Sequence, residues 1–150
     1  MTDRTVTLTR RIAASVDAVY AAWTTESGLR TWYAPVDGWV VGDATVDARV
    51  GGSYRVTFGP APAGDAYIEQ GTYTVVEPGA RLVWNGTVTG DADGENDESH
   101  IEVTFTPDGD GTLLTVVEKG LSPDAADMHE QGWSEALDRL DVVLAPGTAG

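Results

Sequence analysis

The chain has 150 residues, and this length predicts one domain over residues 1–150 with a short C-terminal tail at 145–150. The formal net charge of −15 disfavours binding to nucleic acid or to an anionic membrane surface, because such a charge repels phosphate groups. The absence of cysteine excludes disulfides, thiolate metal sites and cysteine nucleophiles. Without a long apolar run or an apolar signal core, we expect a cytoplasmic protein that does not insert into membranes.

The N-terminal part of the chain predicts one strand followed by two short helices. Residues Arg4–Ile12 alternate regularly between threonine and other side chains, which is typical of a strand. Ser15 or Asp17 can cap a helix whose apolar residues follow at helical spacing, and Gly28 is predicted to end that helix. A second short helix or turn is expected over Leu29–Tyr33, before the next proline.

The central part of the chain predicts strands separated by turns rich in glycine, proline and aspartate. The expected strands are Trp39–Arg49, Ser53–Phe58, Tyr67–Glu77, Arg81–Thr89, Ser99–Pro107 and Thr112–Lys119. Because the connections are short, consecutive strands should pair antiparallel in a meander. In the strand at 99–107, Ile101 and Val103 alternate with Glu102, so one of its faces is apolar and the other polar.

A long amphipathic helix closes the chain. Pro123 stands near its start, and Pro146 follows its last apolar residue. One broad apolar stripe recurs at steps of three and four residues and contains His129, Trp133, Ala136, Leu137, Leu140, Val143 and Leu144. Such a helix is expected to pack its stripe on the sheet, and a curved sheet around one helix can leave a space for a ligand.

Five segments, in this order, resemble one known superfamily. They are residues 11–24, the segment 29–35 with its Trp and Pro, the Asp-x-Arg-x-Gly-Gly-x-Tyr pattern at 47–54, the segments 71–73 and 78–83, and the final-helix segment 129–140. Together they make the chain similar to the START-like superfamily, also called SRPBCC or Bet v-like. The resemblance is to the branch related to the C-terminal domain of the activator of the heat-shock-protein-ninety ATPase.

The resemblance implies an α+β helix-grip fold: a curved seven-stranded antiparallel sheet wraps around the C-terminal helix, with two short helices between strands 1 and 2. It also implies an internal cavity, since the superfamily binds apolar small molecules, lipids and ring compounds. Our leading hypothesis is non-enzymatic binding of an apolar or aromatic small molecule or lipid. Alternatives are a small lyase or cyclase acting on a ring compound, and a chaperone-ATPase activator or stress-response protein acting through protein contacts. The protein is expected to be a monomer or a homodimer.

Ten residues are candidates for the ligand cavity. Five Trp and five Tyr against two Phe are a bias that suits a partly polar cavity. The candidates are Trp32, Trp39, Arg49, Tyr54, Tyr67, Glu69, Trp84, Glu102, His129 and Trp133.

Three kinds of candidate leave alternatives open. His129 is either a structural histidine at the core edge with a backbone hydrogen-bond partner, or a general base or ligand hydrogen-bonding group at the cavity mouth. Arg49 is either paired with Asp47 to fix a hairpin or turned inward toward a ligand carboxylate. Glu69 and Glu102 are mid-strand carboxylates, and whichever faces inward would be the best acid–base candidate.

No cofactor or metal is expected. The acidic run Asp91–Glu98 does not match a helix–loop–helix calcium loop, so a solvated hairpin loop is the preferred interpretation. His100 is expected on the polar face of its strand. We interpret the overall acidity mainly as adaptation to a salt-rich solvent, with a basic partner as the alternative.

Overall fold

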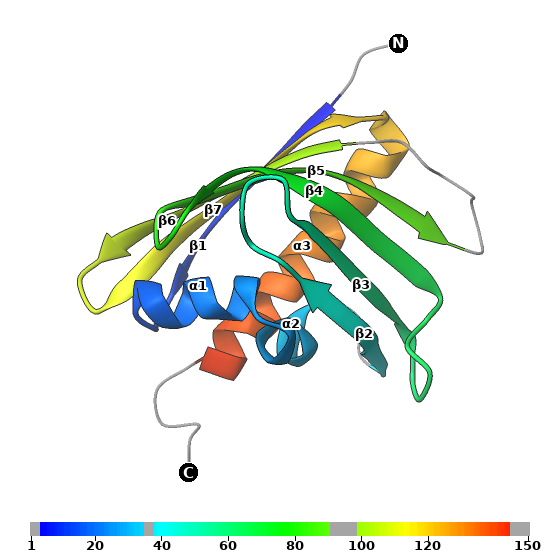
Figure 1. Ribbon diagram of the computed structural model, residues 1–150, viewed down its shortest axis with the longest axis horizontal. Coiled ribbons are helices and arrows are strands. Elements are labelled where there is room, and N and C mark those ends of the chain that lie inside the picture. Colours follow the sequence, from blue (N-terminus) through cyan, green and yellow to red (C-terminus); the bar gives the residue numbers. More distant parts are fainter. Residues whose placement is uncertain (1–3, 35–37, 91–98, 145–150) are drawn as a thin grey trace.

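The computed structural model describes residues 4–34, 38–90 and 99–144 (Figure 1). The elements in chain order are β1 (Arg4–Ile12), α1 (Val16–Thr24), α2 (Glu26–Trp32), β2 (Trp39–Val46), β3 (Ser53–Pro60), β4 (Tyr67–Glu77), β5 (Arg81–Gly90), β6 (Ser99–Asp108), β7 (Gly111–Leu121) and α3 (Pro123–Leu144). Every predicted strand is present, and two short helices lie between the first two strands.

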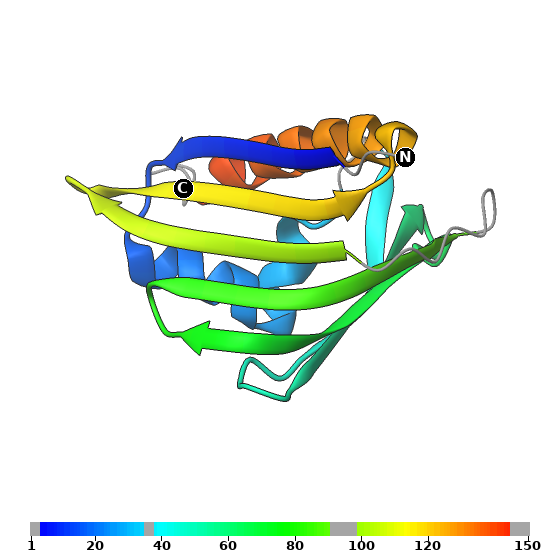
Figure 2. The ribbon, with the colours of Figure 1, turned by 90° about the horizontal axis from the view of Figure 1, so that it is seen from above.

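The strands form one antiparallel sheet in the order β1-β7-β6-β5-β4-β3-β2. The first strand therefore pairs with the last, while β2 to β7 follow one another as a meander. The sheet curves around α3, and α1 and α2 lie on the same concave side (Figures 1 and 2). This arrangement confirms the predicted helix-grip fold.

The boundary between the two short helices differs from the prediction. Gly28 does not end the first helix: α1 ends at Thr24, and Thr25 caps α2 by accepting a hydrogen bond of 3.0 Å from the Gly28 amide. Gly28 lies inside α2, where a Cβ atom would come within 2.7 Å of the Ala22 Cα atom. Glycine is therefore needed for the close contact between the helices. Ser15 caps α1, as one of the two predicted caps.

The strand β2 is also shorter than predicted. The strand ends at Val46 instead of Arg49, because the chain then turns on itself. The Asp47 amide donates to the Ser53 carbonyl, and the Gly52 amide donates to the Arg49 carbonyl, at 2.9 and 2.8 Å. These bonds close a compact β2–β3 connection.

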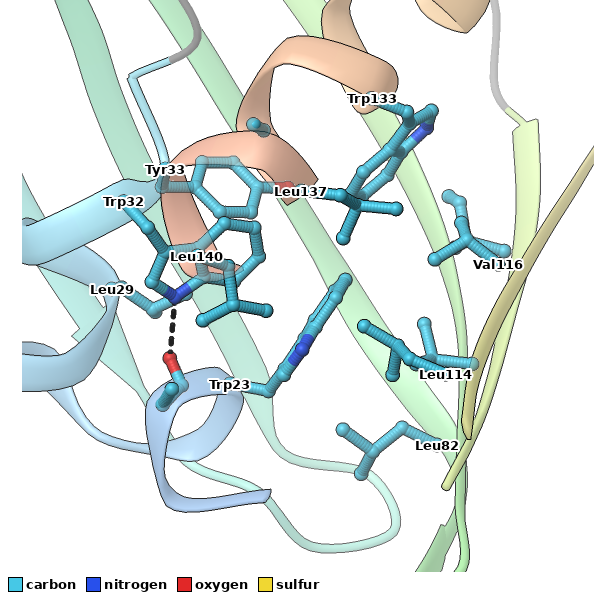
Figure 3. Packing of buried hydrophobic residues seen from close by; sticks show 14 of the residues in the cluster. Trp23, Leu29, Trp32, Tyr33, Leu82, Leu114, Val116, Trp133, Leu137 and Leu140 are labelled. Atoms are coloured by element: carbon cyan, nitrogen blue, oxygen red, sulfur yellow. Dashed lines mark hydrogen bonds between the residues drawn. The ribbon is translucent and has the colours of Figure 1, made fainter. Parts of the chain in front are cut away.

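The core combines many aliphatic side chains with the buried tryptophans Trp23, Trp32, Trp84 and Trp133. Figure 3 shows part of this cluster. Trp23 of α1 stacks on Trp133 of α3, with ring centroids 5.7 Å apart. Trp32 is fully buried, and its indole N–H donates to the Ala22 carbonyl at 2.9 Å. Leu137 and Leu140 of α3 are also fully buried in this cluster. Val143 is 37% exposed, whereas Leu144 is partly buried against the core, so Val143 is the predicted member that leaves the stripe.

Candidate ligand-binding cavity

A cavity of about 320 Å³ lies between the concave face of the sheet and the first half of α3. Its walls come from β2, β3, β4, β7, α3 and the end of α2. The lining residues are Tyr33, Trp39, Phe58, Tyr67, Glu69, Glu118, Met128, His129, Gln131, Gly132, Trp133, Glu135 and Ala136. The space expected between the sheet and the last helix is therefore present.

Aromatic rings form much of the wall. Tyr67 stacks on Trp39 and on Phe58, with centroid distances of 5.5 and 5.7 Å. Tyr33 meets the edge of Trp133 at 6.1 Å and joins this group to the tryptophan core. Large rings with fixed neighbours provide apolar area that is already ordered before a ligand arrives.

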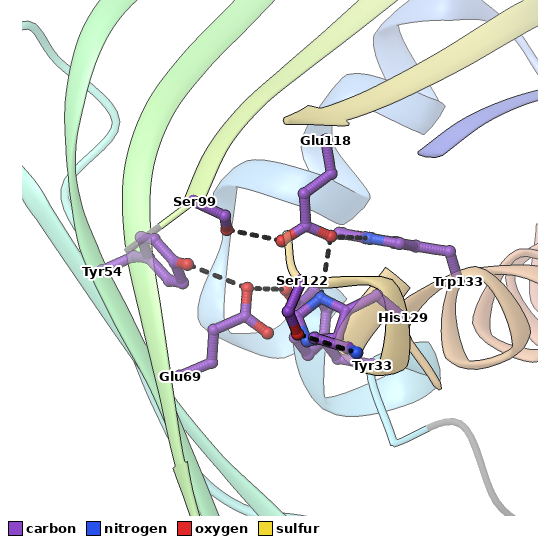
Figure 4. A network of polar contacts seen from close by, with 9 residues as sticks. Tyr33, Tyr54, Glu69, Ser99, Glu118, Ser122, His129 and Trp133 are labelled. Carbon is purple, nitrogen blue, oxygen red and sulfur yellow. Dashed lines mark hydrogen bonds and ion pairs between the residues drawn. The ribbon is translucent and has the colours of Figure 1, made fainter. Parts of the chain in front are cut away.

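Glu69 is a buried carboxylate in this aromatic wall. Tyr67, Glu69 and Tyr73 lie on the same face of β4 because side chains alternate along a strand. The hydroxyls of Tyr33 and Tyr54 donate to Oε2 of Glu69 at 2.7 and 2.9 Å (Figure 4). Burial raises the pKa of Glu69 to about 7, and these two hydrogen bonds only partly oppose the rise.

Two glycines make room for the tyrosine that supports Glu69. Gly71 and Gly86 are paired across β4 and β5. A Cβ atom on Gly86 would lie 2.8 Å from the Tyr54 hydroxyl, and one on Gly71 would lie 2.9 Å from the Tyr54 ring. The missing side chains therefore form the space in which Tyr54 reaches Glu69.

Glu118 of β7 is a second buried carboxylate, and it is only 3% exposed. His129 Nδ1 and Trp133 Nε1 donate to its Oε1 at 2.9 and 2.8 Å, while the Ser99 hydroxyl donates to Oε2 at 2.5 Å (Figure 4). Burial acts to raise the pKa of Glu118, but the three donors and the charge of His129 outweigh it and lower the pKa.

His129 is the partner of this carboxylate. Burial acts to lower the pKa of His129, whereas the hydrogen bond to Glu118 and the negative charges of Glu118 and Glu69 raise it above its ordinary value. The two groups thus stabilise each other as an imidazolium–carboxylate pair. The predicted backbone partner of a structural His129 is replaced by a carboxylate.

The structure brings only part of the predicted site together. Trp39, Tyr67, Glu69, His129 and Trp133 line the cavity, and Tyr54 lies directly behind Glu69. Trp32 and Trp84 are buried in the core and do not line it.

Arg49 and Glu102 lie outside the cavity. The Arg49 side chain is 76% exposed and its Nε donates to Asp47 at 2.8 Å, so the ion-pair alternative matches its position. Glu102 pairs with Arg81 at 2.7 Å and alternates with the buried Ile101 and Val103, which places it on the outer face of the sheet. Of the two mid-strand carboxylates considered, Glu69 is therefore the inward one.

Sequence reasoning missed several residues of the site: Tyr33, Phe58, Ser99 and Glu118. A signal for Glu118 was present, because Leu114, Val116 and Glu118 stand two residues apart in one strand and share the buried face. Tyr33 carries no such signal. It follows a helix of seven residues, and only the packing of α2 against the sheet turns its hydroxyl toward Glu69.

Within the described ranges, no group of three or more His, Cys, Asp or Glu side chains could hold a metal ion. The acidic run Asp91–Glu98 lies outside the described residues. His100 is exposed on the outer face, where its Nδ1 lies 3.0 Å from the Asn85 side-chain oxygen. No helix among the described residues is long and apolar enough to cross a membrane.

The curved sheet, the gripped helix and the cavity between them define a START-like helix-grip domain. More specifically, the chain belongs to the family of Activator of Hsp90 ATPase homolog 1-like proteins, which it matches over residues 13–145. A search of curated protein sequences gives no match.

Solved structures with the same fold cover nearly the whole chain. A protein of Chromobacterium violaceum is 29% identical, with a TM-score of 0.82 over 95% of this chain and 97% of its own. A protein of Rhizobium loti is 26% identical, with a TM-score of 0.76 over 94% and 96%. DynU16, from the dynemicin biosynthetic locus, is 24% identical, with a TM-score of 0.75 over 95% of this chain and 48% of its own, and this likeness concerns the fold alone.

Proposed function

We propose that the protein binds an aromatic or apolar small molecule in the cavity between the sheet and α3, without transforming it. The observation that carries this proposal is a preformed cavity whose wall contains five Trp, Tyr and Phe rings and a buried carboxylate, Glu69, with one oxygen open to a ligand. Ligand sites are typically concave, mostly apolar and equipped with a few oriented polar groups.

The size of the cavity narrows the choice of ligand. At about 320 Å³ it stands at the lower end of the usual range for small-molecule sites. A compound of one or two rings, or a short acyl chain, fits such a volume better than a whole membrane lipid. The stacked rings of Trp39, Phe58 and Tyr67 favour the flat ring compound.

A cavity-filling substitution tests binding directly. Gly132 lines the cavity, and a Cβ atom added there meets no atom within 4 Å, so Gly132→Trp can fill the space without a backbone clash. Val142→Trp adds the same side chain to an exposed position later in α3, where Val142 is 66% exposed. In native mass spectrometry and a thermal-shift panel of aromatics and lipids, Gly132→Trp should lose binding and Val142→Trp should retain it. Equal binding by both variants would exclude this cavity.

Acid–base catalysis on a ring compound is a second candidate, and two observations favour it. His129 has a carboxylate within hydrogen-bonding distance, and Glu69 has a pKa of about 7, which is suited to proton transfer at neutral pH. Once a ligand is found, NMR in D₂O would detect exchange of its acidic C–H protons. Exchange that disappears in Glu69→Gln and persists in Glu102→Gln would identify an enzyme.

An activator role through protein contacts has less support from the surface. The large exposed apolar side chains among the described residues are dispersed over β2, the β2–β3 turn, β7 and α3. Docking sites are normally contiguous apolar patches. A pull-down with the cell's own chaperone would test for a chaperone partner. We also propose that the protein is cytoplasmic.

A further inference from the structure

The cavity has a negative electrostatic character. Its described lining contains the carboxylates of Glu69, Glu118 and Glu135, and no lysine or arginine is among these lining residues. His129 contributes the only basic side chain of this lining, and its Nδ1 is already bonded to Glu118. Because His129 and Glu118 neutralise each other, the ionised Glu69 is the buried carboxylate of this lining that has no positively charged group bonded to it.

Glu69 has one oxygen available to a ligand. Both tyrosine hydroxyls bind Oε2, and no described residue donates a hydrogen bond to Oε1 (Figure 4). The residue is only 9% exposed and lines the cavity. Oε1 therefore faces the cavity without a donor from the described residues, so a ligand group that supplies positive charge or a hydrogen-bond donor can bind it there.

Aromatic rings surround the same space. Tyr67 stands two residues before Glu69 on the same face of β4, and its ring stacks on Trp39 and Phe58. Tyr33 and Trp133, which contact each other, also line the cavity. Faces of Trp and Tyr attract cations through the ring quadrupole, most strongly where water is excluded.

We propose that the cavity selects an organic cation, whose ammonium group lies against Oε1 of Glu69 and whose aromatic or apolar body lies between the aromatic wall and α3. This inference rests on the proposed binding function and specifies its ligand class. A neutral apolar ligand would cover the ionised Glu69 carboxylate without offering it an opposite charge, and an anionic ligand would be repelled by it.

The pH dependence of binding follows from the groups around Glu69. These are Tyr33 after α2, Tyr54 of β3, Glu118 of β7, and His129 and Glu135 of α3. The pKa of Glu69 is about 7, so the carboxylate is largely protonated at pH 5.5 and largely ionised at pH 8. The affinity for a permanent cation should therefore be at least about tenfold higher at pH 8 than at pH 5.5.

A matched ligand series tests the proposal. The probes share a naphthalene body and carry a trimethylammonium-methyl group, its neutral carbon isostere neopentyl, a hydroxymethyl group or a carboxylate. Binding is measured by quenching of tryptophan fluorescence at pH 5.5 and 8. The proteins are the wild type, Glu69→Gln, and Glu102→Gln, which removes the same charge from the outer face of the sheet.

We expect the cation to bind at least about tenfold more tightly than its carbon isostere at pH 8. In Glu69→Gln this preference and its pH dependence should disappear, whereas Glu102→Gln should keep both. Equal or tighter binding of the isostere, the alcohol or the carboxylate would overturn the cation proposal and leave the binding function standing. Failure of every probe to bind the wild type, with none detected by native mass spectrometry, would instead count against the proposed function itself.

Discussion

Glu118 and Glu69 are both buried on the concave face of the sheet, yet the protein treats them differently. Glu118 accepts three hydrogen bonds, one from an imidazole that can carry a positive charge, and its pKa is lowered. Glu69 accepts two bonds from neutral phenols on one oxygen, and its pKa is raised to about 7. The comparison shows that burial alone does not fix the ionisation of a carboxylate. The number and charge of its donors decide it.

The largest expected effect is that of removing the fully paired carboxylate. Glu118→Ala leaves the donors of His129, Trp133 and Ser99 buried without an acceptor. Losing one partner of a buried pair typically costs about 3–5 kcal/mol of the free energy of unfolding. Urea denaturation at pH 7 measures it, with Glu102→Ala on the outer face as control. A loss no larger than that of the control would show that the Glu118 network does not stabilise the fold.

In contrast to Glu118→Ala, the substitution Glu69→Gln should increase the free energy of unfolding at high pH. The pKa of Glu69 is raised from 4.5 in its ordinary state to about 7, so its contribution to stability is complete below pH 4.5 and is lost as the pH rises through 7. The variant has no carboxylate to ionise, so its free energy of unfolding should not fall in this way. Between pH 4.5 and pH 8, the difference in free energy of unfolding between variant and wild type should shift in favour of the variant by up to about 3 kcal/mol. Urea denaturation across this range measures the difference. A difference that does not vary with pH would contradict the raised pKa.

Gly86→Ala tests whether Tyr54 needs the space that Gly86 leaves for its hydroxyl beside Glu69. The added methyl group would crowd the Tyr54 hydroxyl, and overpacking of this kind costs about 1–3 kcal/mol. In contrast, Gly132→Ala on α3 meets no neighbouring atom and should gain about 0.5–1 kcal/mol from helix propensity. Thermal unfolding of both variants measures these opposite shifts. Stabilisation by Gly86→Ala would mean that Tyr54 does not need this space.

The smallest expected effect is a shift in the pKa of one side chain, the imidazole of His129. In the wild type, NMR should place the pKa of His129 above its ordinary value, because Glu118 stabilises the imidazolium. In Glu118→Gln that support is gone, and burial should then move the pKa down. The His100 resonances give an internal control, since this ring lies on the outer face beside Asn85. An unchanged His129 titration in the variant would show that Glu118 is not its effective partner.

Much of the fold could be predicted from the sequence because its signals are local. Alternation along strands, turn residues and the stripe of α3 predicted every strand and the last helix. The same alternation assigns Glu102 to the outer face and would have assigned Glu118 to the inner one. The prediction at Gly28 was wrong because glycine is common at helix ends. Here, the close approach of α1 and α2 requires a glycine inside a helix.

The sequence by itself determined the class of fold and the position of His129 on the buried stripe of α3. Only the tertiary structure decided which side chains meet. It joined Tyr33 and Tyr54 to Glu69, and it joined His129 and Trp133 to Glu118. The physical reason is that periodicity fixes the direction of a side chain relative to its own element. The distance and charge of its partners, which set its pKa, depend on how elements far apart in the chain pack together.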